Sequence, residues 1–270
     1  MILLHYATES GPRLAVKTED GVFDARGASL EQVFAGARPS LGEGLDEESL
    51  RYAPSVPHPA KLICIGLNYR KHAEETGSAL PSRPIVFAKF SNALAACGDE
   101  IPIPKVTAQA DYEAELVIVM GRRTRNVGEN DALDYVYGYT NGNDFSARDL
   151  QNSTAQWTIG KTADKFGPIG PWLVSQDELG DLGPRSITCT VNGEGRQSSN
   201  LGDLIFGVPQ LVSYLSRVFT LEPGDLIFTG TPSGVALGYP DPKPWLKAGD
   251  EVVVEIEGLG KLVNRMVDGV

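Results

Sequence analysis

The fold of this chain is decided by the stretch DYEAELVIVM at residues 111–120. Acidic residues at alternating positions lead into a run of apolar, mostly β-branched residues, and this pattern predicts a β-strand. Successive side chains of a strand point to opposite faces, so Asp111, Glu113 and Glu115 are expected on one face. Two carboxylates about 5 Å apart repel by about 3 kcal/mol at an effective dielectric constant of about 20. A divalent cation between Glu113 and Glu115 would turn that repulsion into attraction, and a strand end solvated by water is the alternative.

A further acid, Asp144, follows the next strand-like run, residues 135–140. Adjacent strands would bring Asp144 beside Glu113 and Glu115, although such an aspartate is also common in turns and at helix N-caps. Three carboxylates without a nearby cysteine or histidine form a set of hard oxygen ligands. Such a set favours Mg²⁺ or Mn²⁺, or Ca²⁺ if the cage is loose, over zinc or copper.

One of the three histidines is a candidate for chemistry. His5 lies inside an apolar run and His58 lies between two prolines, whereas His72 occupies a polar segment after the buried-strand pattern of residues 62–65. At helical spacing His72 and Glu75 are i, i+3 neighbours, so the carboxylate can orient the imidazole and raise its basicity. A general base needs this arrangement. A solvated polar helix is the alternative.

Lys161 follows Gly160 and precedes a turn rich in glycine and proline at residues 167–171. A lysine in such a loop can hold an anionic substrate, although most lysines are surface charges.

Taken together, these segments resemble the fumarylacetoacetate hydrolase superfamily, and the resemblance extends from about residue 61 to 265. The segments that carry it, in chain order, are residues 63–69 with His72, 111–116, 144–151, Gly160-Lys161, 170–174, 191–194, 222–225, 229–232 and 258–260.

The resemblance implies a metal-dependent enzyme that acts on 2-oxo acids, usually by cleaving a C–C bond, and that forms a homodimer. By this resemblance, the ligands of Mg²⁺ or Mn²⁺, with Ca²⁺ possible in crystals, are Glu113, Glu115 and Asp144. His72 and Glu75 match a water-activating dyad on a mobile lid, and Lys161 matches a substrate-binding cation. Further substrate contacts are Arg148, Gln151 and Thr231.

Three positions depart from the family pattern. Asn68 stands where the members that cleave fumarylacetoacetate carry an additional acidic ligand, which argues against that substrate. Ala163 replaces an aromatic residue that is common after the lysine, and Lys165 is an unusual charge close to it. We therefore expect the walls of the pocket to differ.

The predicted activity is hydrolysis of an acylpyruvate-like 1,3-diketo acid, in which pyruvate leaves as an enolate whose charge the metal stabilises. Two alternative activities need the same electron sink and stay open. One is decarboxylation of oxaloacetate or a related 3-carboxy-2-oxo acid, and the other is isomerisation of an unsaturated 2-oxo diacid. An alternative outside enzymology is a binding protein in which the three acids hold a structural Ca²⁺.

Composition narrows the class of protein. The chain has 270 residues, 41% of them hydrophobic, and a formal net charge of −11, which argues against nucleic acid as a partner. It contains no run of about 20 apolar residues that would span a membrane. Its three cysteines have no metal or redox spacing, so a disulfide framework is not expected. We expect a cytoplasmic protein.

The chain is expected to be α+β and mostly β, with two unequal parts. Residues 1–57 predict a small N-terminal α/β domain, and prolines at 54, 57 and 59 mark the boundary. Residues 58–270 predict the catalytic domain, for which the resemblance implies a β-rich core of mixed, β-roll-like sheets. One clear helix is predicted over residues 209–219, with proline near its first turn and an apolar face.

Overall fold

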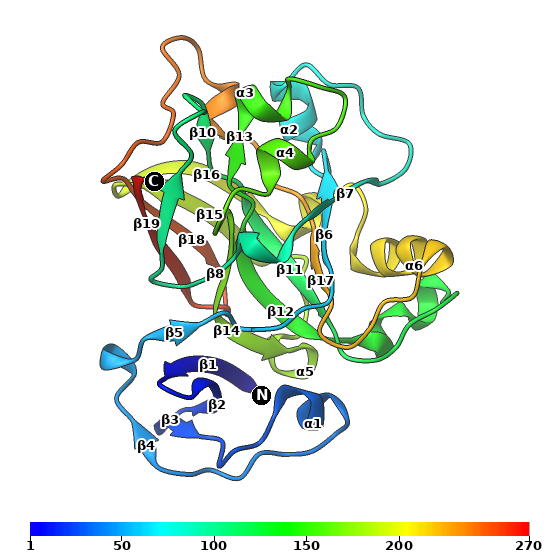
Figure 1. The fold of residues 1–270 in the computed structure, drawn as a ribbon. Helices are drawn as coiled ribbons and strands as arrows, with labels where there is room; N and C mark the ends of the chain where they lie inside the picture. The colour runs from blue at the N-terminus through cyan, green and yellow to red at the C-terminus, as the bar shows by residue number, and fades with distance from the viewer. Residues whose placement is uncertain (270) are drawn as a thin grey trace.

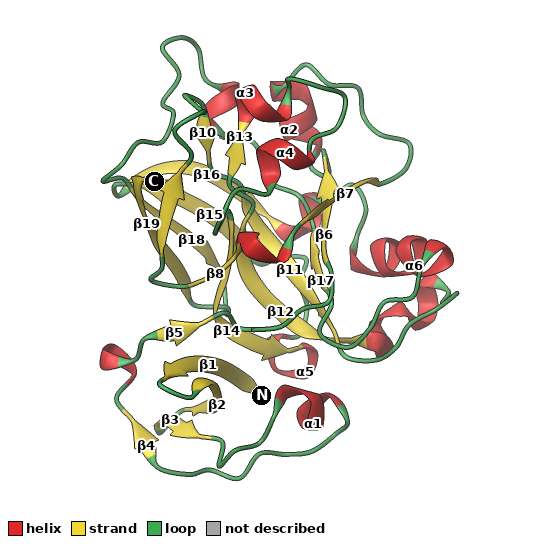
Figure 2. Ribbon diagram, in the orientation of Figure 1, coloured by secondary structure: helices red, strands yellow, loops and turns green. Residues whose placement is uncertain are grey.

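The computed structural model describes residues 1–269, and strands dominate it (Figures 1 and 2). Its largest sheet has twelve strands. Ten of them run in the order β4 (Gly44–Leu45), β3 (Gly21–Asp24), β2 (Gly11–Thr18), β1 (Ile2–Thr8), β14 (Gly167–Ser175), β12 (Val136–Asn143), β11 (Ala114–Met120), β17 (Leu226–Phe228), β6 (Leu62–Gly66) and β7 (Ile85–Lys89), while β5 (Tyr52–Ala53) pairs with β1 and β8 (Leu94–Ala96) pairs with β14.

Two smaller sheets complete the β structure. Five strands follow the order β16 (Glu194–Asn200), β15 (Ser186–Val191), β18 (Glu251–Ile256), β19 (Lys261–Asp268) and β9 (Glu100–Ile103). A short pair consists of β10 (Ala110–Asp111) and β13 (Ser146–Ala147). Parallel and antiparallel pairs coexist, since β17 pairs with β6 in parallel and β11 pairs with β12 antiparallel. The predicted mostly-β class with mixed sheets is confirmed.

The helices are short and lie around the sheets. They are α1 (Leu30–Phe34), α2 (Arg70–Glu75), α3 (Arg148–Gln151), α4 (Thr158–Lys161), α5 (Gln176–Leu179) and α6 (Val208–Val218), together with 3₁₀ segments η1 (Glu47–Ser49), η2 (Ser91–Ala93), η3 (Glu129–Tyr135), η4 (Leu201–Asp203) and η5 (Ala236–Gly238). The helix predicted over residues 209–219 is α6, displaced by one residue. Helices α2, α3 and α4 gather at one end of the molecule, opposite the N-terminal strands (Figure 1).

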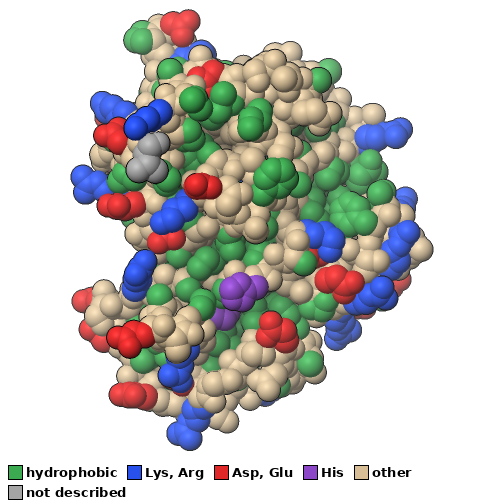
Figure 3. Space-filling view, viewed as in Figure 1, with side chains coloured by type: hydrophobic (Ala, Val, Ile, Leu, Met, Phe, Trp, Pro, Cys, Tyr) green, Lys and Arg blue, Asp and Glu red, His purple; other side chains and the backbone are tan. Residues whose placement is uncertain are grey.

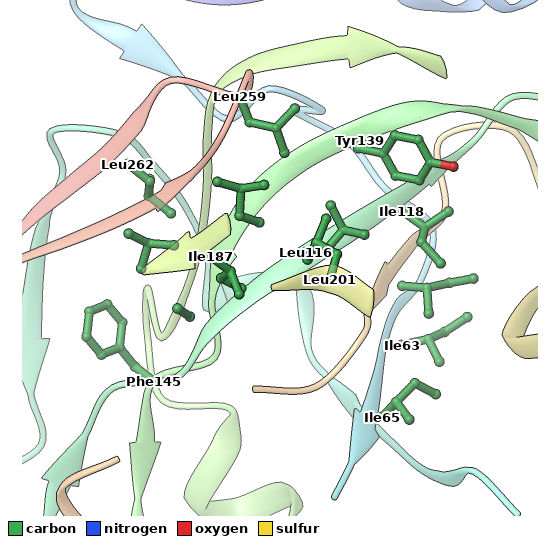
Figure 4. Close-up of a cluster of buried hydrophobic side chains, with 14 of the residues drawn as sticks. Ile63, Ile65, Leu116, Ile118, Tyr139, Phe145, Ile187, Leu201, Leu259 and Leu262 are labelled. Atoms are coloured by element: carbon green, nitrogen blue, oxygen red, sulfur yellow. The ribbon is translucent and has the colours of Figure 1, made fainter. Parts of the chain in front are cut away.

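Strand β11 lies at the centre of the fold, and all seven of its residues are buried. Its alternating side chains serve two clusters. Leu116 and Ile118 pack in the main core with Ile63, Ile65 and Tyr139 (Figure 4). Val117 and Val119 face a second cluster. A strand buried on both faces carries the continuous apolar run seen in residues 116–120.

The N-terminal strands are joined to the rest of the chain through β1, which pairs antiparallel with β14 at Ile2 and Leu3. The second cluster is also shared. Leu3, Leu14 and Val33 from the N-terminal part pack in the same cluster as Phe228 and the outer face of β11. Residues on both sides of the boundary expected near residue 57 therefore share one core, and the division into two domains stays a prediction.

Exposed apolar side chains gather near β7 and the end of α6. Val86, Phe90 and Val218 are all more than 40% exposed. On the face seen in Figure 3, hydrophobic side chains group on the side where β7 and α6 lie, while acidic and basic side chains are scattered. The predicted homodimer stays a prediction.

Candidate active site

The three acids predicted to bind a metal lie together. Glu113 directly precedes β11 and Glu115 is its second residue, while Asp144 directly follows β12, the antiparallel neighbour of β11. The Asp144 backbone N–H donates to the Glu113 carbonyl at 2.9 Å, so the two chain segments are joined at the site itself. One carboxylate oxygen from each of the three residues lies within 4.8 Å of the others, and all three side chains are buried.

Asp111 does not belong to this group, and the expectation that it shares a strand face with Glu113 and Glu115 was wrong. The strand is interrupted at Tyr112 and Glu113, because the Glu113 N–H donates to the side chain of Asn143 instead of to a ladder carbonyl. Asp111 lies in β10 and accepts a hydrogen bond from Arg148 Nε at 2.8 Å.

Three buried cations pair with two of the acids, Glu113 and Asp144. Lys161 Nζ donates to Glu113 Oε2 at 2.6 Å and to Asp144 Oδ2 at 2.9 Å. Arg148 Nη2 lies 2.6 Å from Glu113 Oε1. On the other side, Lys89 Nζ lies 2.6 Å from Asp144 Oδ1. The acids are therefore held in place by fixed positive charges.

Sequence reasoning missed Lys89. This lysine ends β7, and its ammonium also donates to the backbone carbonyls of Phe145, Lys161 and Phe166. A charge at the end of a short apolar strand is usually solvated, so the local pattern held no signal for a buried ammonium. Only the tertiary arrangement of four chain segments brings these oxygens together.

The pKa values of Glu113 and Glu115 shift in opposite directions because the surroundings of the two carboxyl groups differ. Burial raises the pKa of a carboxyl group, but for Glu113 the nearby charges of Lys161 and Arg148 outweigh it, and the pKa is lowered. Burial raises the pKa of Glu115 well above its ordinary value, and the charges of Asp144 and Glu113 raise it further. The Gly230 N–H, which donates to Glu115 at 2.7 Å, only partly opposes this shift.

These residues fit a hard divalent cation. The donors are all carboxylate oxygens, they converge in a buried space, and two of the carboxyl groups raise the pKa of the third. Asp144 Oδ1 accepts no hydrogen bond of suitable direction, although the Lys89 ammonium is near, so a lone pair stays available. A cation at this position would oppose the effects that raise the pKa of Glu115 and would favour its charged form.

The predicted dyad lies in α2. His72 Nδ1 is 3.2 Å from Glu75 Oε2, and the other oxygen, Glu75 Oε1, accepts from the Gly234 N–H at 2.8 Å. His72 is buried, while Glu75 is half-buried. Because a carboxylate only accepts, Nδ1 carries the proton in the neutral ring and Nε2 is the basic nitrogen.

A cavity of about 420 Å³ brings these groups together. The predicted site residues that line it are His72, Glu75, Glu113, Glu115, Arg148, Gln151, Lys161 and Thr231. Asp144 lies behind this surface and is fully buried. Gln151 accepts from Arg148 Nη1 at 3.0 Å, and Thr231 Oγ1 accepts from Gln197 at 2.8 Å. Trp157 and Phe87 form an aromatic wall, with ring centroids 5.5 Å apart.

The three departures from the family pattern lie outside the cavity lining. The Asn68 side chain is occupied by backbone partners, donating to the carbonyls of Phe206 and Thr229 and accepting from the Phe206 N–H. Ala163 packs against the main core, and the Lys165 ammonium is 3.9 Å from Asp99. Neither side chain is among the residues that line the cavity, and the expectation that Ala163 and Lys165 alter its walls stays a prediction.

Comparison with known proteins identifies the class. Residues 61–267 match the family described as "Fumarylacetoacetate (FAA) hydrolase C-terminal", and this match covers most of the chain. The chain belongs to the fumarylacetoacetate hydrolase family, whose enzymes act on small molecules and typically use a divalent metal.

Among individual proteins, the chain is similar to the fumarylacetoacetate hydrolase domain-containing protein 2 homolog of Dictyostelium discoideum, with 51% identity over 77% of this chain and 72% of the relative. It is 40% identical to a mitochondrial oxaloacetate tautomerase of Bos taurus, over 83% of this chain and 71% of the relative.

Solved structures agree in fold. The fumarylacetoacetate hydrolase of Exiguobacterium antarcticum is 33% identical, with a TM-score of 0.89 and full coverage of both chains. A 2-hydroxyhepta-2,4-diene-1,7-dioate isomerase from Mycobacterium marinum is 32% identical, with a TM-score of 0.84 over 99% of this chain and 98% of that one. In the described part of this chain, none of the helices has the length and apolarity needed to cross a bilayer.

Proposed function

We propose that this chain is a divalent-cation-dependent enzyme that forms and reprotonates the enolate of a small 2-oxo acid. One observation carries the proposal: the His72–Glu75 dyad and the acids Glu113 and Glu115 line the same cavity. A base and an electron sink on one substrate are the two groups that enolate chemistry requires.

The roles of the residues follow from their contacts. Glu113, Glu115 and Asp144 would hold the cation, which when bound supplies positive charge to the carbonyl oxygen of the substrate. His72 Nε2 takes a proton, and Glu75 keeps the ring oriented and stabilises the imidazolium that results. Arg148 and Lys161 place positive charge at the cavity wall, where a substrate carboxylate would bind.

Among the reactions that share this step, we favour interconversion of the keto and enol forms of an oxaloacetate-like 2-oxo acid. In that reaction His72 removes a proton from C3 and the proton returns to the enol oxygen or to carbon, so no bond between heavy atoms breaks. Support comes from the oxaloacetate tautomerase of Bos taurus, which matches 83% of this chain at 40% identity.

The second candidate is the hydrolysis of an acylpyruvate. The same dyad can take a proton from a water molecule as readily as from carbon, and a cavity of about 420 Å³ has room for a substrate longer than a four-carbon diacid.

The reactions are distinguished by their products. Purified protein with Mg²⁺ or Mn²⁺ is given oxaloacetate, acetylpyruvate and fumarylpyruvate in parallel, and both enol absorbance and pyruvate are followed. Tautomerisation changes the enol absorbance of oxaloacetate without forming pyruvate, whereas hydrolysis and decarboxylation form pyruvate. Failure to accelerate any of the three above the rate without protein would contradict the proposal, as would full activity in EDTA.

Replacing His72 with Ala tests the base. Turnover should fall by a factor of about 10² to 10⁴, the range typical of general-base catalysis, while Mn²⁺ binding stays unchanged, because His72 donates no ligand atom to the acidic group. Turnover equal to that of the unmodified enzyme would remove His72 from the mechanism.

A further inference from the structure

Residues 234–238, here called the seat segment, contact Glu75 of the dyad and Asp111, and they have no role in the mechanism above. The segment includes η5 and contributes Leu237 to the cavity wall. Its first residue donates the N–H that holds Glu75 Oε1. It therefore touches the one carboxylate on which the orientation of His72 depends.

Two glycines of the seat segment cannot take a side chain without a clash, for different reasons. Gly234 has a φ of +102°, and a Cβ there would lie 2.0 Å from the Arg196 carbonyl oxygen, so its backbone admits only glycine. Gly238 has no such backbone requirement, but a Cβ there would lie 2.2 Å from Glu75 Cδ and 2.3 Å from Glu75 Oε1. The absence of a side chain at Gly238 is what gives the carboxylate its place.

Asp111 holds the seat segment from the opposite side. This fully buried carboxylate accepts the N–H of Ala236 at 2.7 Å and that of Leu237 at 3.1 Å. Its second oxygen also accepts from Arg148, whose guanidinium contacts Glu113. One side chain thus fixes the segment relative to a predicted metal ligand.

We propose that the seat segment positions the His72–Glu75 dyad over the acids, and that Gly238 and Asp111 are its positioning residues. Gly238 leaves the space that Glu75 occupies, and Asp111 ties the segment to Arg148 and Glu113. The predicted effects on turnover rest on the proposed function. The predicted effects on the position of Glu75 do not depend on any substrate.

The first test is Gly238→Ala. The atoms that the new methyl group would strike are the end of a flexible side chain, so the backbone can stay in place while the Glu75 carboxylate moves away from His72 and from the Gly234 N–H. Gly128→Ala is the matched control, because a Cβ there meets nothing closer than 4.0 Å and the residue precedes η3, outside the cavity lining.

Turnover in Gly238→Ala should fall about 10- to 100-fold, the usual effect of losing a group that orients a functional residue. The limb of the pH–rate profile that reports the base should shift, and the dissociation constant of Mn²⁺ should stay within a factor of about two of its original value. Gly128→Ala should match the unmodified enzyme. Equal turnover and an equal pH profile in the two variants would overturn the proposal.

A double variant tests whether Gly238 acts through Glu75. In a Glu75→Gln background the carboxylate is already lost, so Gly238→Ala should cause little further decrease, and the two effects should not multiply. If the two losses multiply, Gly238 acts by another route and the proposal is wrong.

The second positioning residue is tested by Asp111→Asn, with Asp225→Asn as its control. Both aspartates are fully buried, accept a backbone N–H and pair with a cation, but the partners of Asp225 are Lys61 and Glu222, whereas those of Asp111 are Arg148 and the seat segment. Asp111→Asn should lower turnover and also weaken Mn²⁺ binding about 10-fold or more, because Arg148 loses its anchor beside Glu113. An effect no larger than that of Asp225→Asn would contradict the role of Asp111.

Hydrogen exchange separates the failure of this inference from failure of the proposed function. The α2 amides, such as those of Ala73 and Thr76, should exchange faster in Gly238→Ala than in Gly128→Ala, since Glu75 links α2 to the seat segment. This comparison needs no substrate. If no 2-oxo acid is turned over, the proposed function is wrong, but faster exchange would still support the positioning role of the seat segment. Unchanged exchange would overturn that positioning role even if the enzyme is active.

Discussion

Lys89 carries a full charge in the interior, and its four oxygen partners explain why the fold tolerates it. Replacing it with Met keeps the length of the side chain but leaves three carbonyls and one side of Asp144 without their cation. Breaking a buried ion pair from one side typically destabilises a protein by about 3–5 kcal/mol. We expect Lys89→Met to lower the free energy of unfolding by that amount in urea titrations.

Lys261→Met is a suitable control for Lys89. Lys261 pairs with Glu255 at the surface, where both side chains are largely exposed, and such pairs contribute about 1 kcal/mol or less. If the two methionine variants lose equal stability, the buried ammonium is not a structural requirement.

His5 is expected to make the protein sensitive to mild acid. Burial lowers its pKa from 6.5 to about 4, against the opposing effect of its hydrogen bond with the Ser55 carbonyl. In the unfolded chain His5 takes up a proton below pH 6.5, but in the folded protein only near pH 4, so stability is lost as the pH falls between these values. The loss amounts to about 3 kcal/mol, since each unit of pKa difference corresponds to about 1.4 kcal/mol.

The test of this acid sensitivity is the change in unfolding free energy between pH 7 and pH 4. Replacing His5 with Gln, which does not titrate, should reduce that change by about 3 kcal/mol relative to the unmodified protein. Identical pH dependence in the His5 variant and the unmodified protein would show that His5 does not contribute.

Strand β1 and its neighbours cover an apolar face of the large sheet that includes Val117, Leu173 and Phe228. Leu3 and Val33 pack in one cluster with Val117, Leu173 and Phe228, and β1 closes one edge of β14. Deleting residues 1–57 would expose that apolar face and a free strand edge, both of which promote association.

We therefore expect a fragment of residues 58–270 to aggregate or to elute as large species in size-exclusion chromatography, and co-expression with residues 1–57 to restore soluble material. A monomeric fragment that unfolds cooperatively would instead establish the predicted boundary as a true domain boundary.

Local patterns were enough to predict many elements. The apolar run located the body of β11, and the apolar face with its early proline located α6. The same patterns placed Glu113, Glu115 and Asp144 at the ends of neighbouring strands, where the structure has them.

What the patterns could not reveal depends on partners distant in sequence. The break between β10 and β11 exists because the side chains of Asn143 and Gln197 accept the N–H groups of Glu113 and Ala114. Asp111 is drawn away from the other acids by Arg148 and by the seat segment, about 125 residues further along the chain. Such contacts leave no trace in a window of ten residues.

For the molecule as a whole, a divalent cation should act as a stabilising ligand. An ion that binds only the folded state adds about 2.7 kcal/mol when its concentration is 100 times the dissociation constant. For a chain of this size that corresponds to a rise in melting temperature of about 5 to 10 °C. Differential scanning fluorimetry with and without Mn²⁺ measures this shift.

Glu113→Gln is the informative variant for the cation, because it removes one ligand charge from the group of three acids. The shift in melting temperature should largely disappear in it, whereas Glu255→Gln, a change at an exposed surface pair, should keep the full shift. A shift of equal size in both variants would mean that the ion binds elsewhere.

The three acids lie at the adjoining ends of two antiparallel neighbours: Glu115 is within β11, Glu113 just precedes it, and Asp144 just follows β12. The dyad comes from α2, and parts of the cavity wall come from loops attached at other points. The group of three acids can therefore be inherited unchanged while the surrounding loops diverge. Solved relatives named as a hydrolase and an isomerase share the overall fold, and a relative named as a tautomerase is similar in sequence. Exchange of residues 67–80 or 232–247 alone could accordingly change which reaction is catalysed, while β11 and β12 are kept unchanged.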